Sequence, residues 1–70
     1  MQRTPVSSSD IRSIGYDAST AVLEVEFNAG SVYRYFNVPA HIHSNFMVAA
    51  SHGKFLNDYI RYNYQYQRVS

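Results

Sequence analysis

The feature that most constrains the fold is an alternation of side-chain character in residues 21–27, Ala-Val-Leu-Glu-Val-Glu-Phe. The odd positions place apolar side chains on one face of an extended chain, and the two glutamates lie on the other face. A period of two is typical of an antiparallel strand with one buried and one solvated face. Asn-Ala-Gly at 28–30 favours a turn, and residues 31–36, Ser-Val-Tyr-Arg-Tyr-Phe, form a second candidate strand. The sequence therefore predicts a β-hairpin.

The length of the hairpin loop decides which side chains of the second strand face the core. One residue of slip in the register moves every side chain of a strand to the opposite face. A two-residue loop would put Arg34 on the apolar face, and Tyr33 and Tyr35 outside with the glutamates. A three-residue loop over 28–30 puts the two tyrosines on the apolar face and Arg34 outside, opposite Glu24.

The residues favour the three-residue loop for three reasons. Gly30 occupies the position at which such a loop needs a left-handed backbone conformation. The same register avoids enclosing the Arg34 guanidinium without a partner, which would be costly. It also sets Arg34 opposite Glu24, a cross-strand pair that contributes roughly 0.2–1 kcal/mol. We therefore expect Tyr33 and Tyr35 to pack under the helices, with their hydroxyls at the edge of the core, and Arg34 to face solvent.

The segments around the hairpin predict one more strand and two helices. Residues 11–16 are a candidate strand, and Pro39 suits the first turn of a helix that Asn37 would cap if it starts at Val38. Ser51 is a suitable N-cap for a second helix. Apolar residues recur at helical spacing in two runs: Ile42, Phe46, Ala49 and Ala50, then Phe55, Leu56, Tyr59 and Ile60.

The predicted fold is α+β, a three-stranded antiparallel β-meander packed on two C-terminal helices. The tail alternates again, with Tyr62, Tyr64, Tyr66 and Arg68 on one side, and both a short fourth C-terminal strand and an ordered arm fit that pattern. Residues 1–9 are polar and serine-rich and are expected to form a flexible N-terminus. Residues 10–70 are then expected to form a single domain, because a chain of 70 residues is long enough for only one.

Composition narrows the classes of function. The chain has no cysteine, which excludes disulfides and thiolate metal sites. No apolar run approaches the roughly 20 residues of a membrane-spanning helix, and no signal peptide precedes the domain, so we expect a cytoplasmic protein without membrane contact. The net charge of +1 and the pI of about 8.1 fall short of the strongly basic footprint of many nucleic-acid-binding domains.

No residue pattern indicates a catalytic site, so we expect neither an enzyme nor a bound cofactor. His41 and His43 stand two residues apart, which places them on different sides of a helix rather than around one metal ion. Ser51-His52-Gly53-Lys54 at a helix start could hold a phosphate on its free backbone N–H groups. A helix–helix connection, in which Gly53 supplies backbone freedom, explains the same four residues more simply.

Several residues together resemble the KTSC domain family: Tyr33-x-Tyr35, Val38-Pro39 and the run Ser51-x-Gly53-x-Phe55-x-Asn57-x-x-Ile60-Arg61. The resemblance covers about residues 8–69. The family is named for its occurrence at the C-terminus of some lysyl-tRNA synthetases and also includes stand-alone small bacterial and phage proteins. The resemblance implies RNA binding as a hypothesis and supplies no catalytic residues. The positions that match the family pattern are Tyr33, Tyr35, Gly53, Asn57, Ile60 and Arg61.

Two kinds of partner remain open, a tRNA-like or single-stranded RNA and a protein partner or second copy of the chain. Candidate contact residues are basic or aromatic, because bases stack on aromatic rings; they are Arg34, Phe36, Lys54, Arg61, Tyr64, Tyr66 and Arg68. Glu24 and Glu26 would repel a phosphate backbone from the outer sheet face. That face and the C-terminal tail therefore also suit a protein-interaction module. Tyr33, Tyr35, Gly30 and Gly53 are assigned structural roles.

Overall fold

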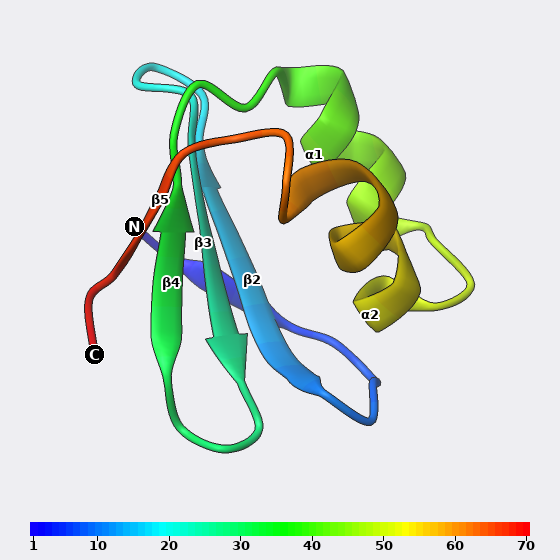
Figure 1. Cartoon of the computed structure of the whole chain (residues 1–70). Helices are drawn as coiled ribbons and strands as arrows, with labels where there is room; N and C mark the ends of the chain where they lie inside the picture. The colour runs from blue at the N-terminus through cyan, green and yellow to red at the C-terminus, as the bar shows by residue number, and fades with distance from the viewer.

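The computed structural model describes residues 1–70 and has a five-stranded antiparallel sheet with its helices on one face (Figure 1). The strands are β1 (Arg3–Pro5), β2 (Ile11–Asp17), β3 (Val22–Phe27), β4 (Val32–Tyr35) and β5 (Tyr66–Arg68), and they lie in the sheet in chain order. Between β4 and β5 come α1 (Ala40–Met47), α2 (His52–Phe55) and the π-helical turn η1 (Leu56–Ile60). None of these helices has the length and apolar character needed to cross a membrane.

The β3–β4 hairpin has the predicted three-residue loop. Its cross-strand pairs are Leu23–Tyr35, Glu24–Arg34 and Val25–Tyr33. The backbone N–H of Phe27 donates to the carbonyl of Ser31 at 2.9 Å, and Gly30 adopts φ +104°, the left-handed conformation expected there. Tyr35 is only 3% exposed and Tyr33 is half-buried against the core. The predicted orientation of both tyrosines is confirmed.

Two short edge strands enlarge the predicted three-stranded meander. β5 pairs with β4, so the tail does form a strand, but it begins only at Tyr66; Tyr62 lies in the preceding turn and is 82% exposed. β1 pairs with β2, with Arg3 opposite Gly15, so the N-terminal segment that we expected to be flexible contributes a fifth strand. Both strands are only three residues long, and each lies at an edge of the sheet and pairs with one neighbouring strand.

The first helix differs from its prediction and the second agrees with it. Asn37 does not cap α1, because it has φ +58° and lies in a turn; the helix begins at Ala40 and ends before the predicted alanine positions. The hydroxyl of Ser51 accepts a hydrogen bond from the backbone N–H of Lys54 at 3.2 Å, as expected of an N-cap. α2 then runs directly into the wider turn of η1.

The core lies between the sheet and the helices. Its buried members are Ile11, Ile14, Leu23, Val25, Tyr35, Val38, Phe46, Leu56 and Ile60. Phe46, Leu56 and Ile60 come from the two predicted apolar stripes, whereas Tyr59 of the second stripe is 54% exposed. The wider π-helical turn is a local departure from the 3.6-residue period on which that stripe was predicted.

Candidate binding pocket between the hairpin and the second helix

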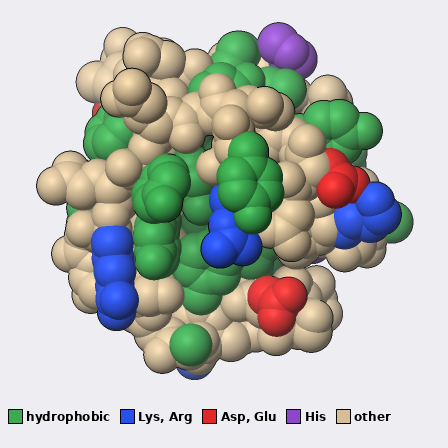
Figure 2. Space-filling model, in the orientation of Figure 1, with side chains coloured by type: hydrophobic (Ala, Val, Ile, Leu, Met, Phe, Trp, Pro, Cys, Tyr) green, Lys and Arg blue, Asp and Glu red, His purple; other side chains and the backbone are tan.

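A pocket of about 540 Å³ opens between the β3–β4 hairpin and the α2–η1 helix, on the helix-covered side of the sheet. Figure 2 shows apolar side chains on the floor of a hollow on this side, with basic and acidic side chains near its rim. The lining residues with polar side chains include Asp10, Tyr33, Tyr35, Asn57, Arg61 and Tyr66. A volume of several hundred Å³ is typical of small-molecule and cofactor sites.

Three tyrosine rings form one wall of the pocket. The ring of Tyr66 lies 5.8 Å, between centroids, from the rings of both Tyr33 and Tyr35. Among the tyrosines of the chain, only Tyr16 donates its hydroxyl to a protein group, the carbonyl of Val38. No buried polar side-chain atom lacks a partner, so the hydroxyl of Tyr35 must open onto the pocket although the residue is almost wholly enclosed. The wall therefore offers both apolar ring faces and unpartnered hydroxyls.

Arg61 supplies positive charge at this wall. Burial raises the pKa of the Tyr35 phenol above its ordinary value of 10.0; the Arg61 charge opposes the shift, and Tyr33 and Tyr66 add to it. The phenol is therefore neutral at physiological pH and can both donate and accept a hydrogen bond. Nη1 of Arg61 donates to Oδ1 of Asn57 at 3.2 Å, one helical turn away, and this bond helps to orient the guanidinium.

Asp10 stands at another part of the lining and is positioned by its backbone. The backbone N–H of Asn28 donates to the carbonyl of Asp10 at 2.8 Å, and the Asn28 side-chain amide donates to the carbonyls of Ser8 and Ser9 at 3.1 and 2.9 Å. A Cβ atom on Gly53 would lie 3.2 Å from Oδ2 of Asp10. The prediction that Gly53 supplies backbone freedom is therefore wrong, since the glycine instead makes room for this carboxylate. No salt bridge engages Asp10.

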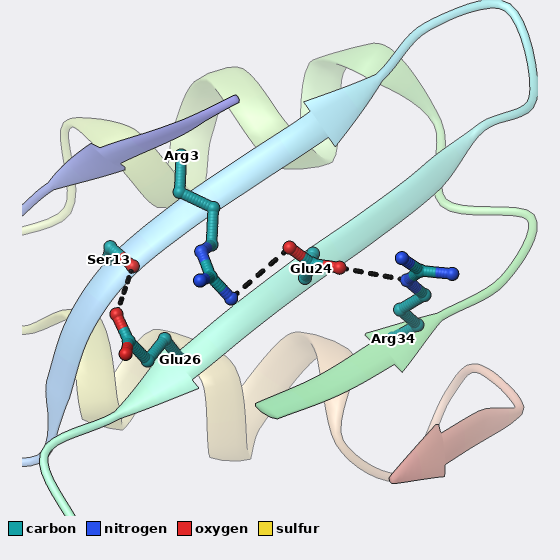
Figure 3. Close-up of polar contacts among 5 residues, drawn as sticks. All are labelled: Arg3, Ser13, Glu24, Glu26 and Arg34. Atoms are coloured by element: carbon teal, nitrogen blue, oxygen red, sulfur yellow. Dashed lines mark hydrogen bonds and ion pairs between the residues drawn. The ribbon is translucent and has the colours of Figure 1, made fainter. Parts of the chain in front are cut away.

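The opposite face of the sheet carries polar side chains that satisfy one another (Figure 3). Glu24 is 6% exposed; it accepts from Nε of Arg34 at 2.8 Å and pairs with Nη1 of Arg3 at 3.3 Å. The hydroxyl of Ser13 donates to Glu26 at 2.8 Å. The predicted Glu24–Arg34 pair is confirmed. Two arginines flank Glu24 and compensate its charge, which the prediction of repulsion between this face and a phosphate backbone did not include.

The comparisons with known proteins agree with this fold. The family model of the KTSC domain matches residues 7–69. The chain belongs to the KTSC domain family. The crystal structure of a KTSC domain protein from Yersinia pestis superposes with a TM-score of 0.93 at 43% identity, over 99% of this chain and 97% of that one. An uncharacterized protein of Stutzerimonas stutzeri is 39% identical over 70 residues, 99% of both chains. A lysine–tRNA ligase of Nostoc punctiforme is 34% identical over 60 residues, which is 86% of this chain but 11% of the ligase.

The residues that carried the resemblance to KTSC domains converge in space. Tyr33, Tyr35, Gly53, Asn57 and Arg61 all line the pocket, although they come from β4, α2, η1 and the turn that follows. The sixth matching residue, Ile60, lies in the core beneath them. The residues of this chain that match the family pattern therefore either line one pocket or, in the case of Ile60, pack in the core beneath it.

The predicted contact residues do not form one surface. Of these, Arg61 and Tyr66 line the pocket, whereas Arg34 is on the opposite face of the sheet. Nζ of Lys54 bonds the Asp58 carboxylate at 2.6 Å, and this hydrogen bond raises the pKa of Lys54. Because the Ser51 hydroxyl also accepts from the backbone N–H of Lys54, both the ammonium and the backbone N–H of this residue of the predicted phosphate site are engaged within the chain.

The remaining predicted residues lie outside the pocket. Arg68 donates from Nε to the carbonyl of Ser70 at 3.0 Å, Phe36 is half-buried, and Tyr64 packs against the core. Asp10 was not predicted as a pocket residue, because no residue near it in the sequence indicates that the distant hairpin turn binds its backbone. No three His, Cys, Asp or Glu residues are grouped as metal ligands would be, and the ring of His43 stacks on Tyr16 at 4.6 Å between centroids.

Proposed function

We propose that this KTSC domain is a non-enzymatic module that binds single-stranded RNA, with the tyrosine-lined pocket as its site. The observation that carries the proposal is the meeting of three tyrosine rings and the Arg61 guanidinium in one pocket. Single-stranded RNA is recognised by stacking unpaired bases on aromatic side chains and by hydrogen bonds to their edges, with cations along the backbone. The pocket offers all three kinds of contact.

Exposed aromatic and basic groups continue beyond the pocket. Tyr66 is 57% exposed, and Arg68 follows it on the same face of β5. The guanidinium of Arg61 lies 5.8 Å from the ring centroid of the exposed Tyr62. The ligase of N. punctiforme, by its name, acts on a tRNA, and a segment similar to this chain forms part of it. These features support a path for a short strand along the C-terminal segment.

The test is fluorescence anisotropy of a labelled single-stranded RNA of about ten nucleotides, titrated with the protein at about 50 and 200 mM salt. If about three phosphates are engaged, log affinity falls with log salt at a slope near −2, which is a loss of roughly 15- to 20-fold between the two conditions. Arg61→Gln is expected to weaken binding and to reduce the slope by about 0.7, the share of one phosphate contact.

Arg34→Gln is the matched control for this titration. It removes the same charge from the opposite face of the sheet, so RNA affinity should not change. Absence of binding at low salt would overturn the proposal. Equal losses in the Arg34 and Arg61 variants would also overturn it, because they would show a response to net charge rather than to the pocket.

A second candidate, docking of a protein strand, rests on the free edge of β5. β5 is the last strand of the sheet, so its outer backbone groups have no strand partner and resemble the edges to which peptides add. The edge is only three residues long, which makes it a smaller site than the pocket. Self-association through this edge predicts a dimer by size-exclusion chromatography with light scattering, and a monomer at high protein concentration contradicts it.

A further inference from the structure

We propose that the pocket selects a guanine base and that the Asp10 carboxylate is the selecting group; this rests on the function proposed above. Asp10 and Arg61 both line the pocket, so it presents a carboxylate as well as a cation. A general phosphate-binding surface needs only the cation, and a carboxylate would weaken it. The presence of both charges indicates a ligand that carries hydrogen-bond donors in one part and negative charge in another.

Guanine is the RNA base that matches a carboxylate. An ionised carboxylate only accepts hydrogen bonds, through two oxygens. The Watson–Crick edge of guanine presents two adjacent donors, N1–H and the N2 amino group, which can meet both oxygens at once. Adenine and cytosine place a ring-nitrogen acceptor beside their amino group, and uracil flanks its single N–H with two carbonyls. Each of these three bases would set an acceptor against a carboxylate oxygen, so the carboxylate disfavours them.

The position of Asp10 is built by contacts that do not use its charge. Asn28 holds the backbone of residues 8–10 through three hydrogen bonds. Gly53 lets Oδ2 approach to within 3.2 Å of where a Cβ would stand. The three salt bridges of the chain employ other carboxylates, Glu24 and Asp58, and leave Asp10 free. A carboxylate whose backbone is held at the pocket, and which is exposed and not paired within the chain, is available to a ligand.

The other groups of the pocket complement the rest of a guanine nucleotide. The rings of Tyr33 and Tyr66 provide apolar surface for the base, whereas Tyr35 is almost wholly enclosed. Their hydroxyls make no hydrogen bond to protein and can donate to the O6 and N7 acceptors of guanine. Arg61 is the cation of the pocket lining that can pair with the attached phosphate. In this arrangement Asp10 binds the edge of the base and Arg61 binds the phosphate of the RNA backbone.

The experiment compares short uridine oligonucleotides that carry one variable central base: guanine, hypoxanthine (inosine), adenine, cytosine or uracil. Affinities are measured by fluorescence anisotropy at low salt. The guanine oligonucleotide should bind roughly tenfold or more tightly than the adenine, cytosine and uracil ones, the effect expected of a hydrogen bond to a charged group. Inosine keeps N1–H but lacks the N2 amino group, so its affinity should be intermediate.

Asp10→Asn should abolish the preference for guanine, because the amide no longer presents two acceptors, and it should raise the affinity for the all-uridine oligonucleotide, because the disfavouring charge is gone. Asp17→Asn, which changes the same charge outside the pocket, should keep the preference. Equal binding of all five oligonucleotides to the native protein, or a guanine preference that survives Asp10→Asn, would overturn guanine selection and leave RNA binding standing. Failure of every oligonucleotide to bind would overturn both proposals.

Discussion

The two faces of the sheet use their polar residues in opposite ways. On the outer face, Glu24 is enclosed by Arg3 and Arg34, so its charge is compensated by partners within the chain. In the pocket, the backbone of Asp10 is hydrogen-bonded to Asn28, and neither the Asp10 carboxylate nor the Tyr35 hydroxyl has a protein partner. Polar groups that satisfy one another hold strands together. Positioned groups without a partner are available for binding. We therefore infer that the polar residues of the outer face stabilise the fold, and that those of the pocket bind a ligand.

The strongest test of this difference changes a glycine in each region. A Cβ on Gly15 would lie 2.9 Å from Cγ of Arg3 and 3.0 Å from the carbonyl of Gln2, so Gly15→Ala must displace β1 and its ion pair. We expect a loss of about 2–3 kcal/mol in the free energy of unfolding, the range of overpacked sites. Urea denaturation measures it.

Gly53→Ala should behave differently, because the added methyl meets only the Asp10 side chain and no backbone atom. The glycine lies within α2, where alanine is favoured by about 0.5–1 kcal/mol. We expect unchanged or slightly increased stability together with weaker RNA binding. Equal losses of stability in the Gly15 and Gly53 variants would break the comparison.

A smaller effect is expected from Glu24→Gln, which keeps the shape of the side chain but removes its charge. Arg3 and Arg34 then lose an ionised partner, and the free energy of unfolding should fall by about 1–2 kcal/mol, since both arginines are partly exposed and can reach water. Thermal denaturation at low and high salt checks this. Glu26→Gln still accepts from Ser13, so a loss as large as that of Glu24→Gln would argue against the central role of Glu24.

The smallest effect comes from removing one hydroxyl at a partnered and at an unpartnered site. Tyr16→Phe loses the bond to the carbonyl of Val38 and should lower the free energy of unfolding by about 1 kcal/mol. Tyr35→Phe removes a hydroxyl without a protein partner and should change stability by less than about 0.5 kcal/mol while weakening RNA binding. Destabilisation by Tyr35→Phe equal to that by Tyr16→Phe would mean that the pocket hydroxyl is structural.

The sequence predicted those parts of the fold that depend on local pattern. The hairpin register followed from Gly30 and from the pairing of Glu24 with Arg34, because each constrains residues close in the chain. Ser51 as an N-cap is equally local. β1 was missed, since an Arg-Thr-Pro segment shows no alternation and its pairing requires Gly15 to let the Arg3 side chain cross toward Glu24.

The pocket was predicted only in part, and for the same reason. The resemblance supplied Tyr33, Tyr35 and Arg61, and the structure shows that they share one pocket. The position of Asp10 in the pocket could not be predicted from the sequence. It depends on Asn28, eighteen residues later in the chain, and on the absence of a side chain at Gly53. Contacts between distant segments leave no periodic signal in the sequence.

The most direct test of the account is a map of backbone amide chemical shifts during titration with a short single-stranded RNA at low salt. The account predicts that the largest changes occur around the pocket, at residues 9–11, 27–35, 53–61 and 66, and that Arg3 and Gly15 at the covered row of the outer face change little. Changes concentrated on that outer row, with the pocket undisturbed, would contradict it.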